Sequence, residues 1–440
     1  MRYALLGLGV SNRAVIDFLK NKDVSIFVSE KNHIDDRTKN YLESLGVNYE
    51  EGINSENLLN SDVIVVSPGI KPSHPLIKKA LEKGIRLTTE LDLAYEEISR
   101  SGKKIVAVTG TNGKTTTTRL TAFILSKKYR IFEGGNIGTP LISAMENLEN
   151  YELIVCEVSS FQLYWSSFFK PNIGILLNIA PDHLDWHASY EEYFESKISM
   201  FRRQEEKDVA LISRNTEGIE KTVVDLRSRV FLFDEYKGYR VRSNDTHLYF
   251  EDEDLHVQIK RIPVHLRENF IAAISTALYL GLNPREIVES LENFQLLPHR
   301  FEFVAEIEGV SFINDSKATN AHAVVSALKN FERKNVILIL SGLGKNEDYS
   351  DLKHSIAEKC KAVVAFGAMK RLAESFVKNV PLVLVENMEE AIKASMEFAS
   401  PGDVVILSPG GSSFDLYSSY VERGEDFKRC IQKTIAKRNS

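Results

Sequence analysis

The stretch VAVTGTNGKTTTT, residues 106–118, decides the fold of this 440-residue chain. Its apolar beginning predicts a strand that ends at Thr109, Gly110 and Gly113 predict a turn, and a helix is expected from Lys114 onward. A glycine-rich turn between a strand and a helix directs backbone N–H groups and the positive end of the helix at phosphate oxygens. The stretch therefore predicts a phosphate-binding loop in an α/β domain.

The residues that open the predicted helix specify the ligand more closely. Lys114 is expected at the β- and γ-phosphates, and the hydroxyl of Thr115 is expected to bind Mg²⁺. Val108 stands where the usual spacing has glycine, so the loop is a variant of the pattern. A chance glycine-rich turn does not require the Lys-Thr pair, and we predict a site for a nucleoside triphosphate.

Short apolar runs alternate with helix-length amphipathic stretches on both sides of this loop. The runs lie at residues 3–8, 24–28, 63–67, 105–109, 153–158, 173–178, 336–341, 362–367 and 404–408. Continuous rather than alternating hydrophobicity is typical of parallel strands buried on both faces. The fold class is therefore predicted to be α/β, with polar loops at the carboxyl edge of each sheet, where such folds bind ligands.

Two segments with alternating hydrophobicity interrupt this pattern. Residues 241–260 and residues 301–313 each predict an antiparallel hairpin. With a connector at 295–299, the pattern predicts three domains at residues 1–93, 94–297 and 298–440.

The composition limits the class of protein. The chain has 55 Lys and Arg against 61 Asp and Glu, and a net charge of −6 gives no reason to expect nucleic acid or an anionic membrane as a partner. Three widely spaced cysteines exclude a disulfide scaffold and suit a reducing compartment. No signal peptide is evident, and no apolar run approaches the ~20 residues that span a bilayer. We expect a cytoplasmic protein without membrane insertion.

A second glycine-rich turn, GLGVSN at residues 7–12, follows the first predicted strand, and Glu30 ends the next one. This resembles a dinucleotide-binding fingerprint, but Asn12 stands where the third glycine allows close packing of helix on strand. The turn supports a Rossmann-like domain better than it supports a redox cofactor. An NAD-dependent oxidoreductase is nevertheless one alternative function, and a regulatory P-loop ATPase is another.

Three further polar residues are candidates for chemistry near the phosphate loop. Glu157 ends a buried-type strand and is a natural partner for Mg²⁺, although a surface ion pair is the alternative. His183 and His187 have the spacing of zinc ligands, but no third ligand is evident; we favour a functional His183 and a structural His187. Lys197 lies in an amphipathic helix predicted at 190–201, and the pattern alone predicts an exposed lysine there.

Polar loops in the last third of the chain predict a second site. NDSKATN at 314–320 combines a carboxylate, an amine, hydroxyls and amides, and LSPGGSSFD at 407–415 joins a strand to a helix through small residues. SGLGK at 341–345 is another polar loop expected at the carboxyl end of a strand in the same domain. Arg300 at the connector could bind a phosphate or a carboxylate.

Taken together, these motifs resemble the ATP-dependent Mur ligases of peptidoglycan synthesis. The matching segments are TGTNGKTT, CEVSSFQL, NIAPDHLDWH, LPHRFE, NDSKATN and LSPGGSSFD, in order along the whole chain. The first domain and the segment YVERG at 420–424 are similar to the branch of the family that adds D-glutamate. The resemblance implies a Rossmann-like N-terminal domain for the UDP-substrate, a central P-loop domain for ATP and a Rossmann-like C-terminal domain for the amino acid.

The resemblance also implies a reaction and its substrates. ATP phosphorylates the carboxylate of UDP-N-acetylmuramoyl-L-alanine, and the amine of D-glutamate attacks the acyl phosphate to form an amide. A carboxylate is a poor electrophile, so phosphorylation supplies the leaving group, and catalysis is then mainly positioning and charge neutralisation. A monomer is expected.

Family positions assign candidate residues to each ligand. ATP is assigned to Gly110, Thr111, Asn112, Gly113, Lys114, Thr115, Thr116, Asn269, Arg300 and Asp315. The UDP-substrate is assigned to Val10, Ser11, Glu30, Lys31, Gly69, Asn136 and Ser159. D-Glutamate is assigned to Lys317, Thr319, Lys345, Ser413, Phe414 and Tyr420. The implied catalytic residues are Lys114, Glu157, His183 and Lys197.

The resemblance implies two Mg²⁺ sites, one at Thr115 and Glu157 and the other at His183 and Lys197. In the family this lysine is carbamylated, which replaces a cation that repels Mg²⁺ by an anionic oxygen. CO₂ adds only to the neutral amine, so the site has to lower the lysine pKa from ~10.4. The chain departs from the family pattern at Leu266, where Asn is usual, and near the acceptor-site lysine at Leu343, where Asp is common.

Overall fold

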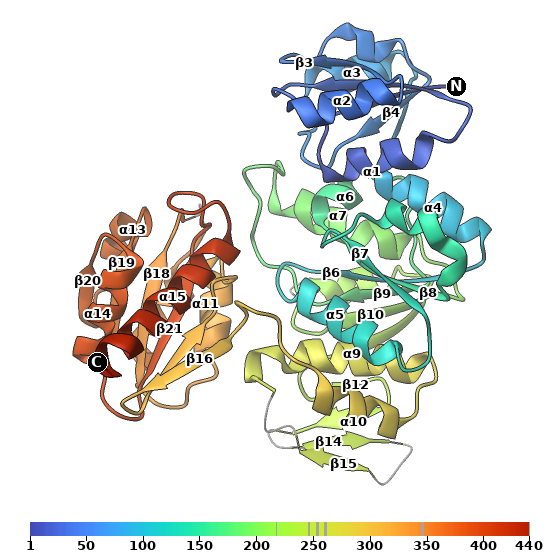
Figure 1. The fold of residues 1–440 in the computed structure, drawn as a ribbon. Coiled ribbons are helices and arrows are strands. Elements are labelled where there is room, and N and C mark those ends of the chain that lie inside the picture. The colour runs from blue at the N-terminus through green and yellow to red at the C-terminus, as the bar shows by residue number, and fades with distance from the viewer. Residues whose placement is uncertain (217, 245–246, 252–254, 259–261, 345–346, 440) are drawn as a thin grey trace. The chain divides into compact units, whose positions relative to one another are not determined.

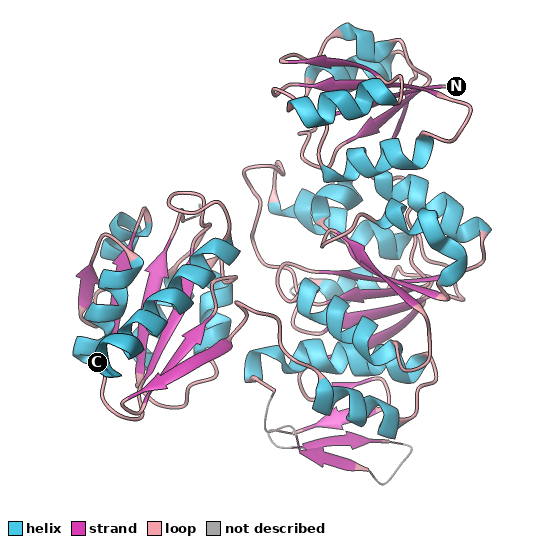
Figure 2. Ribbon diagram, in the orientation of Figure 1, coloured by secondary structure: helices cyan, strands magenta, loops and turns pink. Residues whose placement is uncertain are grey.

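The computed structural model describes residues 1–440 except 217, 245–246, 252–254, 259–261, 345–346 and 440. The chain forms two compact units. One comprises Met1–Ile179, His183–Ile259 and Glu268–Asn293, and the other comprises Ala180–Asp182, Lys260–Arg267 and Phe294–Ser440. Each unit contains at least one sheet of mainly parallel strands with helices packed on it (Figures 1 and 2).

The first unit begins with a five-stranded parallel sheet in the order β3-β2-β1-β4-β5. Its strands are β1 (Arg2–Leu6), β2 (Ser25–Glu30), β3 (Asn48–Glu51), β4 (Val63–Val66) and β5 (Arg86–Thr88). The helical elements that connect and follow them are α1 (Val10–Leu19), α2 (Asp36–Ser44), η1 (Glu56–Leu59), α3 (Pro75–Glu82) and α4 (Glu90–Arg100). The order 3-2-1-4-5 is the doubly wound pattern expected of a Rossmann-like domain.

A six-stranded parallel sheet follows, in the order β11-β10-β9-β6-β8-β7. Its strands are β6 (Lys104–Thr109), β7 (Ile131–Gly135), β8 (Leu153–Glu157), β9 (Ile173–Leu176), β10 (Val209–Ser213) and β11 (Arg229–Phe233). Its helical elements are α5 (Lys114–Leu125), η2 (Leu141–Asn150), α6 (Ser160–Trp165), α7 (Tyr190–Arg202) and α8 (Ile219–Val223). Since β6 lies between β8 and β9, the loop after β6 is flanked by the loops after both neighbours.

A small antiparallel sheet completes the first unit, in the order β12-β13-β14-β15. Its strands are β12 (Lys237–Gly238), β13 (Val241–Ser243), β14 (His247–Phe250) and β15 (His256–Gln258). The hairpin predicted at residues 241–260 is thus part of a larger sheet. The helical elements η3 (Val264–Leu266), α9 (Arg267–Tyr279) and α10 (Pro284–Asn293) follow it.

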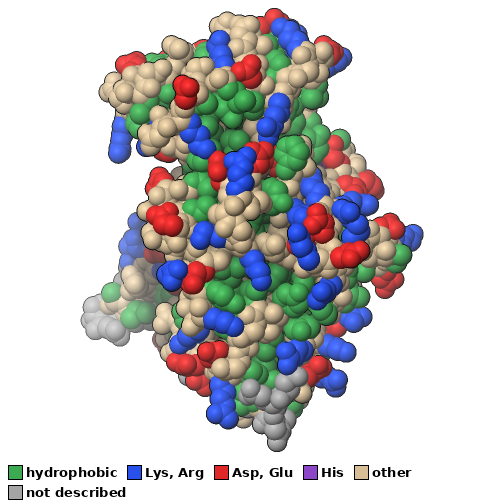
Figure 3. Space-filling view, turned by 90° about the vertical axis from the view of Figure 1, so that its right-hand side faces the viewer, with side chains coloured by type: hydrophobic (Ala, Val, Ile, Leu, Met, Phe, Trp, Pro, Cys, Tyr) green, Lys and Arg blue, Asp and Glu red, His purple; other side chains and the backbone are tan. Residues whose placement is uncertain are grey.

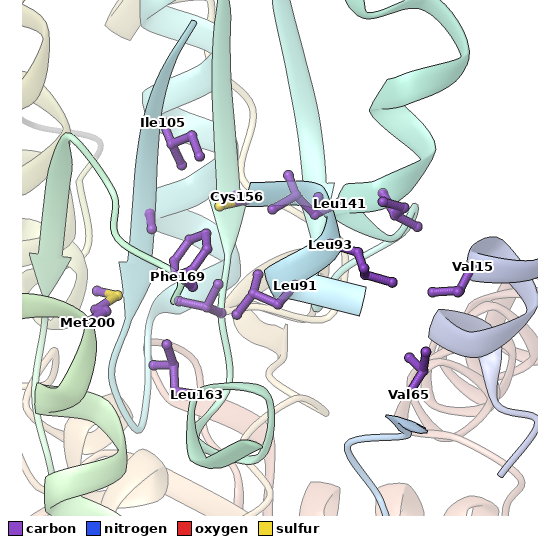
Figure 4. Close-up of a cluster of buried hydrophobic side chains, with 14 of the residues drawn as sticks. Val15, Val65, Leu91, Leu93, Ile105, Leu141, Cys156, Leu163, Phe169 and Met200 are labelled. Carbon is purple, nitrogen blue, oxygen red and sulfur yellow. The ribbon is translucent and has the colours of Figure 1, made fainter. Parts of the chain in front are cut away.

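The first and second sheets of this unit share one hydrophobic core. Val15 and Val65 of the first sheet layer belong to the same buried cluster as Leu91 on α4 and Ile105 and Cys156 of the central sheet (Figure 4). Burial of this continuous apolar surface supplies the main favourable free energy that holds the two sheets together.

The second unit contains a six-stranded sheet in the order β16-β17-β21-β18-β19-β20. Its strands are β16 (Glu302–Ile307), β17 (Val310–Asn314), β18 (Val336–Ser341), β19 (Cys360–Phe366), β20 (Leu382–Leu384) and β21 (Val404–Gly410). The helices are α11 (Ala321–Leu328), α12 (Ser350–Lys359), α13 (Met369–Phe376), α14 (Met388–Phe398) and α15 (Tyr420–Asn439). Only the pair β16 and β17 is antiparallel, which confirms the hairpin predicted at residues 301–313.

All nine predicted apolar runs form strands. The predicted helix from Lys114 is α5, which ends at Leu125. The predicted domain boundary at 93/94 falls inside α4, so the three-domain division stays a prediction.

Two surface properties bear on the expected partners. In the part of the chain that the structure describes, we find no helix whose length and apolar character would let it cross a membrane. On the face that Figure 3 shows, basic and acidic side chains are interspersed.

Candidate active site

The loop between β6 and α5 has the geometry of a phosphate-binding turn. Gly113 is the residue before α5 and has a φ of 83°, a left-handed conformation that favours glycine. A Cβ atom there would lie 2.1 Å from Nδ2 of Asn269. Asn269 on α9 donates hydrogen bonds to the carbonyl of Gly113 (3.2 Å) and to the hydroxyl of Thr117 (2.9 Å). The predicted ATP residue Asn269 therefore holds the loop.

A residue that the sequence analysis missed holds the other side of the loop. Asn178, after β9, accepts hydrogen bonds from the backbone N–H of Thr111 through its carbonyl and of Asn112 through Oδ1, both at 2.8 Å. Its Nδ2 also donates to the carbonyl of Asn112 at 3.1 Å. The sequence offered one signal for this role, since Asn178 is the polar residue that ends the apolar run at 173–178.

Lys114 donates from Nζ to the carbonyls of Gly110 and Thr111, each at 2.9 Å. The lysine thus lies across its own loop, within reach of any phosphate bound there. Thr116 is buried in the first turn of α5, as expected for a residue behind the loop.

Glu157, at the end of β8, connects the loop to its neighbours. Its Oε2 accepts from the hydroxyl of Thr115 at 2.7 Å, and its Oε1 accepts from Nδ2 of Asn136 at 2.9 Å. The side chain is buried, with 3% of its surface exposed. A carboxylate and a hydroxyl at hydrogen-bond distance are hard oxygen donors of the kind that Mg²⁺ prefers. These residues therefore fit the predicted first metal site.

A cavity of about 290 Å³ lies beside Asn136. It is lined by Val10, Ser11, Ser67, Pro68, Gly135, Asn136, Gly138, Pro140 and Gln162. The structure thus brings three of the predicted UDP-substrate residues, Val10, Ser11 and Asn136, to one cavity. Ser159 is not among the lining residues, but it forms a capping box at the start of α6 with Gln162, which is.

The other predicted UDP-substrate residues lie near the first glycine-rich turn and the loop after β4. Glu30 accepts from the backbone N–H of Leu8 at 2.6 Å and of Asn32 at 2.8 Å, so its carboxylate holds the turn. Lys31 is exposed. Gly69 lies in the loop after β4, and its carbonyl accepts a hydrogen bond from the indole of Trp186.

Lys197 is buried, with 1% of its surface exposed, so the exposed lysine predicted from the amphipathic pattern is wrong. Its Nζ donates to the carbonyl of Gly110 at 2.7 Å and lies 4.7 Å from the ring centre of Tyr193. Tyr193 in turn contacts the hydroxyl of Thr111 at 2.8 Å. The helix turns this lysine inward because its apolar neighbours on α7 pack on the core, and the amine reaches the phosphate loop.

His183 is held in an unusual conformation. Its φ is 57°, and its ring packs edge-on against Phe161 at 4.7 Å between centres. His187 is buried, with Nε2 3.0 Å from the hydroxyl of Ser160, and burial lowers its pKa. This environment agrees with a structural His187. Among the described residues, no group of three His, Cys, Asp or Glu side chains could hold a metal by itself.

The predicted amino-acid residues lie in the second unit, at the carboxyl ends of neighbouring parallel strands. Nζ of Lys317 is 4.0 Å from the ring centre of Tyr420, Thr319 lies two residues further along the same loop, Ser413 is buried and Phe414 is 72% exposed. Lys345 lies outside the described residues.

Arg423 organises these loops, and the sequence analysis gave it no role of its own. It is completely buried on α15 and donates to the hydroxyl and carbonyl of Ser316, at 3.1 and 2.9 Å, and to the carbonyl of Gly411 at 3.1 Å. A buried arginine that bonds to two loops fixes their separation. Burial lowers its pKa to about 10.

The remaining predicted nucleotide residues also lie in the second unit. Asp315 is buried and accepts from the hydroxyl of Ser408 at 3.0 Å and the backbone N–H of Phe301 at 3.2 Å. Burial raises its pKa to about 7, although these bonds and the nearby Arg300 oppose the shift.

Three family models match successive parts of the chain. They are the MurD N-terminal domain at residues 2–76, the Mur ligase middle domain at residues 108–277 and the Mur ligase glutamate ligase domain at residues 299–411.

Curated relatives match the chain over nearly its full length. A UDP-N-acetylmuramoylalanine–D-glutamate ligase from Thermotoga sp. (strain RQ2) is 40% identical, covering 98% of this chain and 99% of its own. The enzyme of the same name from Aquifex aeolicus is 38% identical, with the same coverage of both chains.

Solved structures share the fold at low sequence identity. The MurF ligase from Thermotoga maritima in complex with ADP has a TM-score of 0.66 at 18% identity, covering 94% of this chain and 96% of its own. The MurC ligase from the same organism has a TM-score of 0.59 at 20% identity, covering 99% and 100%.

Proposed function

Because the chain belongs to the Mur ligase family, we propose that it uses ATP to join D-glutamate to UDP-N-acetylmuramoyl-L-alanine, in the synthesis of peptidoglycan precursors. The relatives of nearly 40% identity over the full chain are D-glutamate ligases, which supports the choice of acceptor within the family. The NAD-dependent alternative loses its main support, because Glu30 binds its own loop rather than standing free for a ribose.

The observation that carries the proposal is the position of Glu157. One carboxylate oxygen bonds to Thr115 of the phosphate loop, and the other bonds to Asn136 on the wall of the adjoining cavity. A triphosphate on the loop and a second substrate in the cavity would therefore meet at this side chain. Such an arrangement suits transfer of a phosphoryl group between two bound substrates, whereas a simple ATPase needs no second cavity.

The chain's own residues can perform the first step by positioning and charge neutralisation. Lys114 would exchange its bonds to the loop carbonyls for bonds to the β- and γ-phosphates, and its charge would offset the negative charge that develops there. The loop N–H groups and the start of α5 add partial positive charge. The product of this step is the acyl phosphate of the L-alanyl carboxylate and ADP.

Two Mg²⁺ ions are part of the proposal. Thr115 and Glu157 would hold one, and His183 with a carbamylated Lys197 would hold the other; the ions would offset phosphate charge and polarise the reacting oxygens. The burial of Lys197 supports the carbamate, because burial favours the neutral form of an amine, and CO₂ adds only to that form. Nζ also lies 2.7 Å from the carbonyl of Gly110, so an anionic group there would adjoin the phosphate loop.

The second step is attack by the amine of D-glutamate on the acyl phosphate, with loss of phosphate. We assign acceptor binding to Lys317, Thr319, Lys345, Ser413, Phe414 and Tyr420. Positive charge and hydroxyl donors in this set suit the two carboxylates of the acceptor. Arg300 and Asp315 are proposed to contact ATP. The domain division at 93/94 and 297/298, a monomeric state and a cytoplasmic location belong to the same proposal.

The test is ATP-dependent phosphate release by the purified protein with UDP-N-acetylmuramoyl-L-alanine, with and without D-glutamate, together with detection of the amide product by mass spectrometry. We expect release only when both substrates are present. Release that requires no sugar nucleotide would support the ATPase alternative. Equal release with other D- or L-amino acids would contradict the assigned acceptor.

A further inference from the structure

The chain has two tryptophans, and both bind the same loop. This loop, residues 67–71, follows β4, and its residues Ser67 and Pro68 line the cavity beside Asn136. Trp165, at the end of α6, donates from its indole nitrogen to the carbonyl of Ile70 at 3.0 Å. Trp186 donates to the carbonyl of Gly69 at 3.4 Å. Two indoles thus hold adjacent carbonyls of a loop that forms one wall of the cavity.

Trp186 also belongs to the turn that carries His183. The carbonyl of His183 accepts hydrogen bonds from the backbone N–H groups of Trp186 and His187, both at 3.0 Å. This closed turn accommodates the left-handed conformation of His183, which is uncommon for residues other than glycine. Trp186 and His183 also pack against the same ring, Phe161, at 4.9 and 4.7 Å between centres.

A second contact joins the loop to this turn. Lys71, an exposed residue, donates from Nζ to the carbonyl of Asp185 at 2.7 Å. The loop therefore holds the His183 turn at two points, through Trp186 and through Lys71. Trp165 holds the loop but lies outside the turn.

We propose that Trp186 and Lys71 are positioning residues that fix His183 through the cavity loop, so that a ligand in the cavity also orders the His183 turn. This inference rests on the proposed function, in which the sugar nucleotide fills the cavity and His183 holds a metal ion. Ordering of the loop by the first ligand then favours binding of the second, and by linkage the effect is reciprocal.

Single-tryptophan variants test the coupling without turnover. Trp165→Phe leaves Trp186 as the sole tryptophan, and Trp186→Phe leaves Trp165. Titration with UDP-N-acetylmuramoyl-L-alanine, without ATP or metal, should change the fluorescence emission of both variants. Adding Lys71→Ala should weaken the response of Trp186 and preserve the response of Trp165. An unchanged response of Trp186 in the Lys71→Ala background would overturn the proposal.

Steady-state kinetics provide the second test. Trp186→Phe keeps the aromatic packing but removes one hydrogen bond, and Lys71→Ala removes the other contact from a surface position. Each should lower kcat by roughly three- to tenfold and raise the Mg²⁺ concentration for half-maximal rate, with little change in the KM of ATP. The double variant should be only about as slow as the slower single variant, because both contacts hold one turn.

Trp165→Phe is the matched control. It removes one hydrogen bond to the loop but keeps both contacts between the loop and the His183 turn, so it should raise the KM of the sugar nucleotide and leave kcat within about twofold. An equal loss of kcat in Trp165→Phe, or a wild-type kcat in both Trp186→Phe and Lys71→Ala, would overturn the proposal. Failure of the proposed function would differ: the wild-type protein would show no D-glutamate-dependent turnover, whatever the fluorescence shows.

Discussion

The chain contains two glycine-rich loops of similar local form, GLGVSN at residues 7–12 and GTNGKT at residues 110–115. Each joins a parallel strand to a helix, and in each the residue before the helix is a glycine without a side-chain cap. In the first loop, backbone groups are bonded to side chains of the chain itself. Glu30 accepts a hydrogen bond from the N–H of Leu8, and Asn12 donates one to the carbonyl of Gly7 at 2.7 Å.

Two asparagines from other elements hold the second loop. Asn178 and Asn269 fix its two sides, while the lysine, the hydroxyl of Thr115 and the carboxylate of Glu157 gather at one edge. The comparison teaches that a glycine-rich turn acquires the geometry of a phosphate site when neighbouring elements support the loop and gather a lysine, a hydroxyl and a carboxylate at one edge of it. The predictions below test this difference.

The largest effect is expected at Lys114. Lys114→Ala should reduce phosphate release by a factor on the order of a thousand, because the lysine that lies across the loop would offset the charge of the β- and γ-phosphates. The measurement is phosphate release at saturating substrates. Arg13, on the helix after the first loop, is the comparison: Arg13→Ala should leave the KM of ATP unchanged. An equal loss of phosphate release in the two variants would contradict the assignment of ATP to the second loop alone.

Lys197→Ala should be the next most damaging change, because the buried amine beside Gly110 would be lost together with the carbamate proposed for it. Acetate should partly restore turnover by supplying an anionic oxygen in the space that the side chain leaves. The measurement is turnover against acetate concentration, with the wild-type protein as the control that acetate should not accelerate. Full activity of the alanine variant without acetate would contradict the role of Lys197.

Adding one methyl group to each loop gives a matched pair. In Gly113→Ala the new Cβ would lie 2.1 Å from Nδ2 of Asn269 at a left-handed φ, so the loop or the asparagine must move. In Gly9→Ala the φ is −70° and the nearest atom, Oγ of Ser67, is 3.3 Å away. We expect the KM of ATP to rise roughly tenfold or more in Gly113→Ala and to stay unchanged in Gly9→Ala. Initial rates at varied ATP concentration measure the KM of both variants.

Restoring the missing glycine of the first loop should not create a dinucleotide site. Asn12 is completely buried, and its amide donates to the carbonyls of Gly7, Leu6 and Val65. Asn12→Gly should therefore lower the free energy of unfolding by about 1–3 kcal/mol, as judged by urea unfolding. Titration with NADH should show no binding to the wild-type protein or the variant. Binding of NADH by the variant would mean that Asn12 alone had blocked a redox site.

The sequence predicted the inner strands better than the edges. The nine predicted runs became strands such as β18 and β21, whose residues are buried on both faces and therefore form continuous apolar runs. The edge strands β3 and β5 were missed, since NYEE and RLT carry polar residues where one side meets solvent.

In the candidate site, the sequence predicted the glycine-rich turn from Gly110 to Thr116, because its residues follow one another along the chain. It could not predict contacts between elements that are distant in the chain. The burial of Lys197 depends on how α7 packs against the loop after β6, and the hydrogen bonds of Asn178 to that loop depend on the strand order β9-β6-β8. The role of Arg423 was not predicted for the same reason, because its partners Ser316 and Gly411 lie on two other loops.

The smallest effect on turnover is expected where the two loop-bearing sheets are joined, and a change there should appear in stability instead. Glu90, at the start of α4, is 2% exposed; its Oε1 accepts from the N–H of Ile142 at 2.7 Å, and its Oε2 has no hydrogen-bond partner among the described residues. Burial raises the pKa of this carboxyl from 4.5 to about 7. Between these values the folded protein keeps a proton that the unfolded chain has released, so stability should fall as the pH rises from 4.5 to 7.

Glu90→Gln removes this titration while keeping an acceptor for Ile142 and adding a donor where Oε2 is unpaired. The variant should be more stable than the wild type by roughly 3 kcal/mol at pH 8, the free energy of a pKa difference from 4.5 to about 7, and nearly equal to it near pH 4.5. Urea unfolding across this pH range measures the difference. The control is Glu96→Gln. Glu96 lies on the same helix as Glu90, and its partly exposed carboxylate pairs with Arg86 of β5. This variant should leave the dependence of stability on pH unchanged. A wild-type slope in Glu90→Gln would show that the joint between the two sheets contributes nothing to the pH dependence, and that the carboxylates elsewhere govern it.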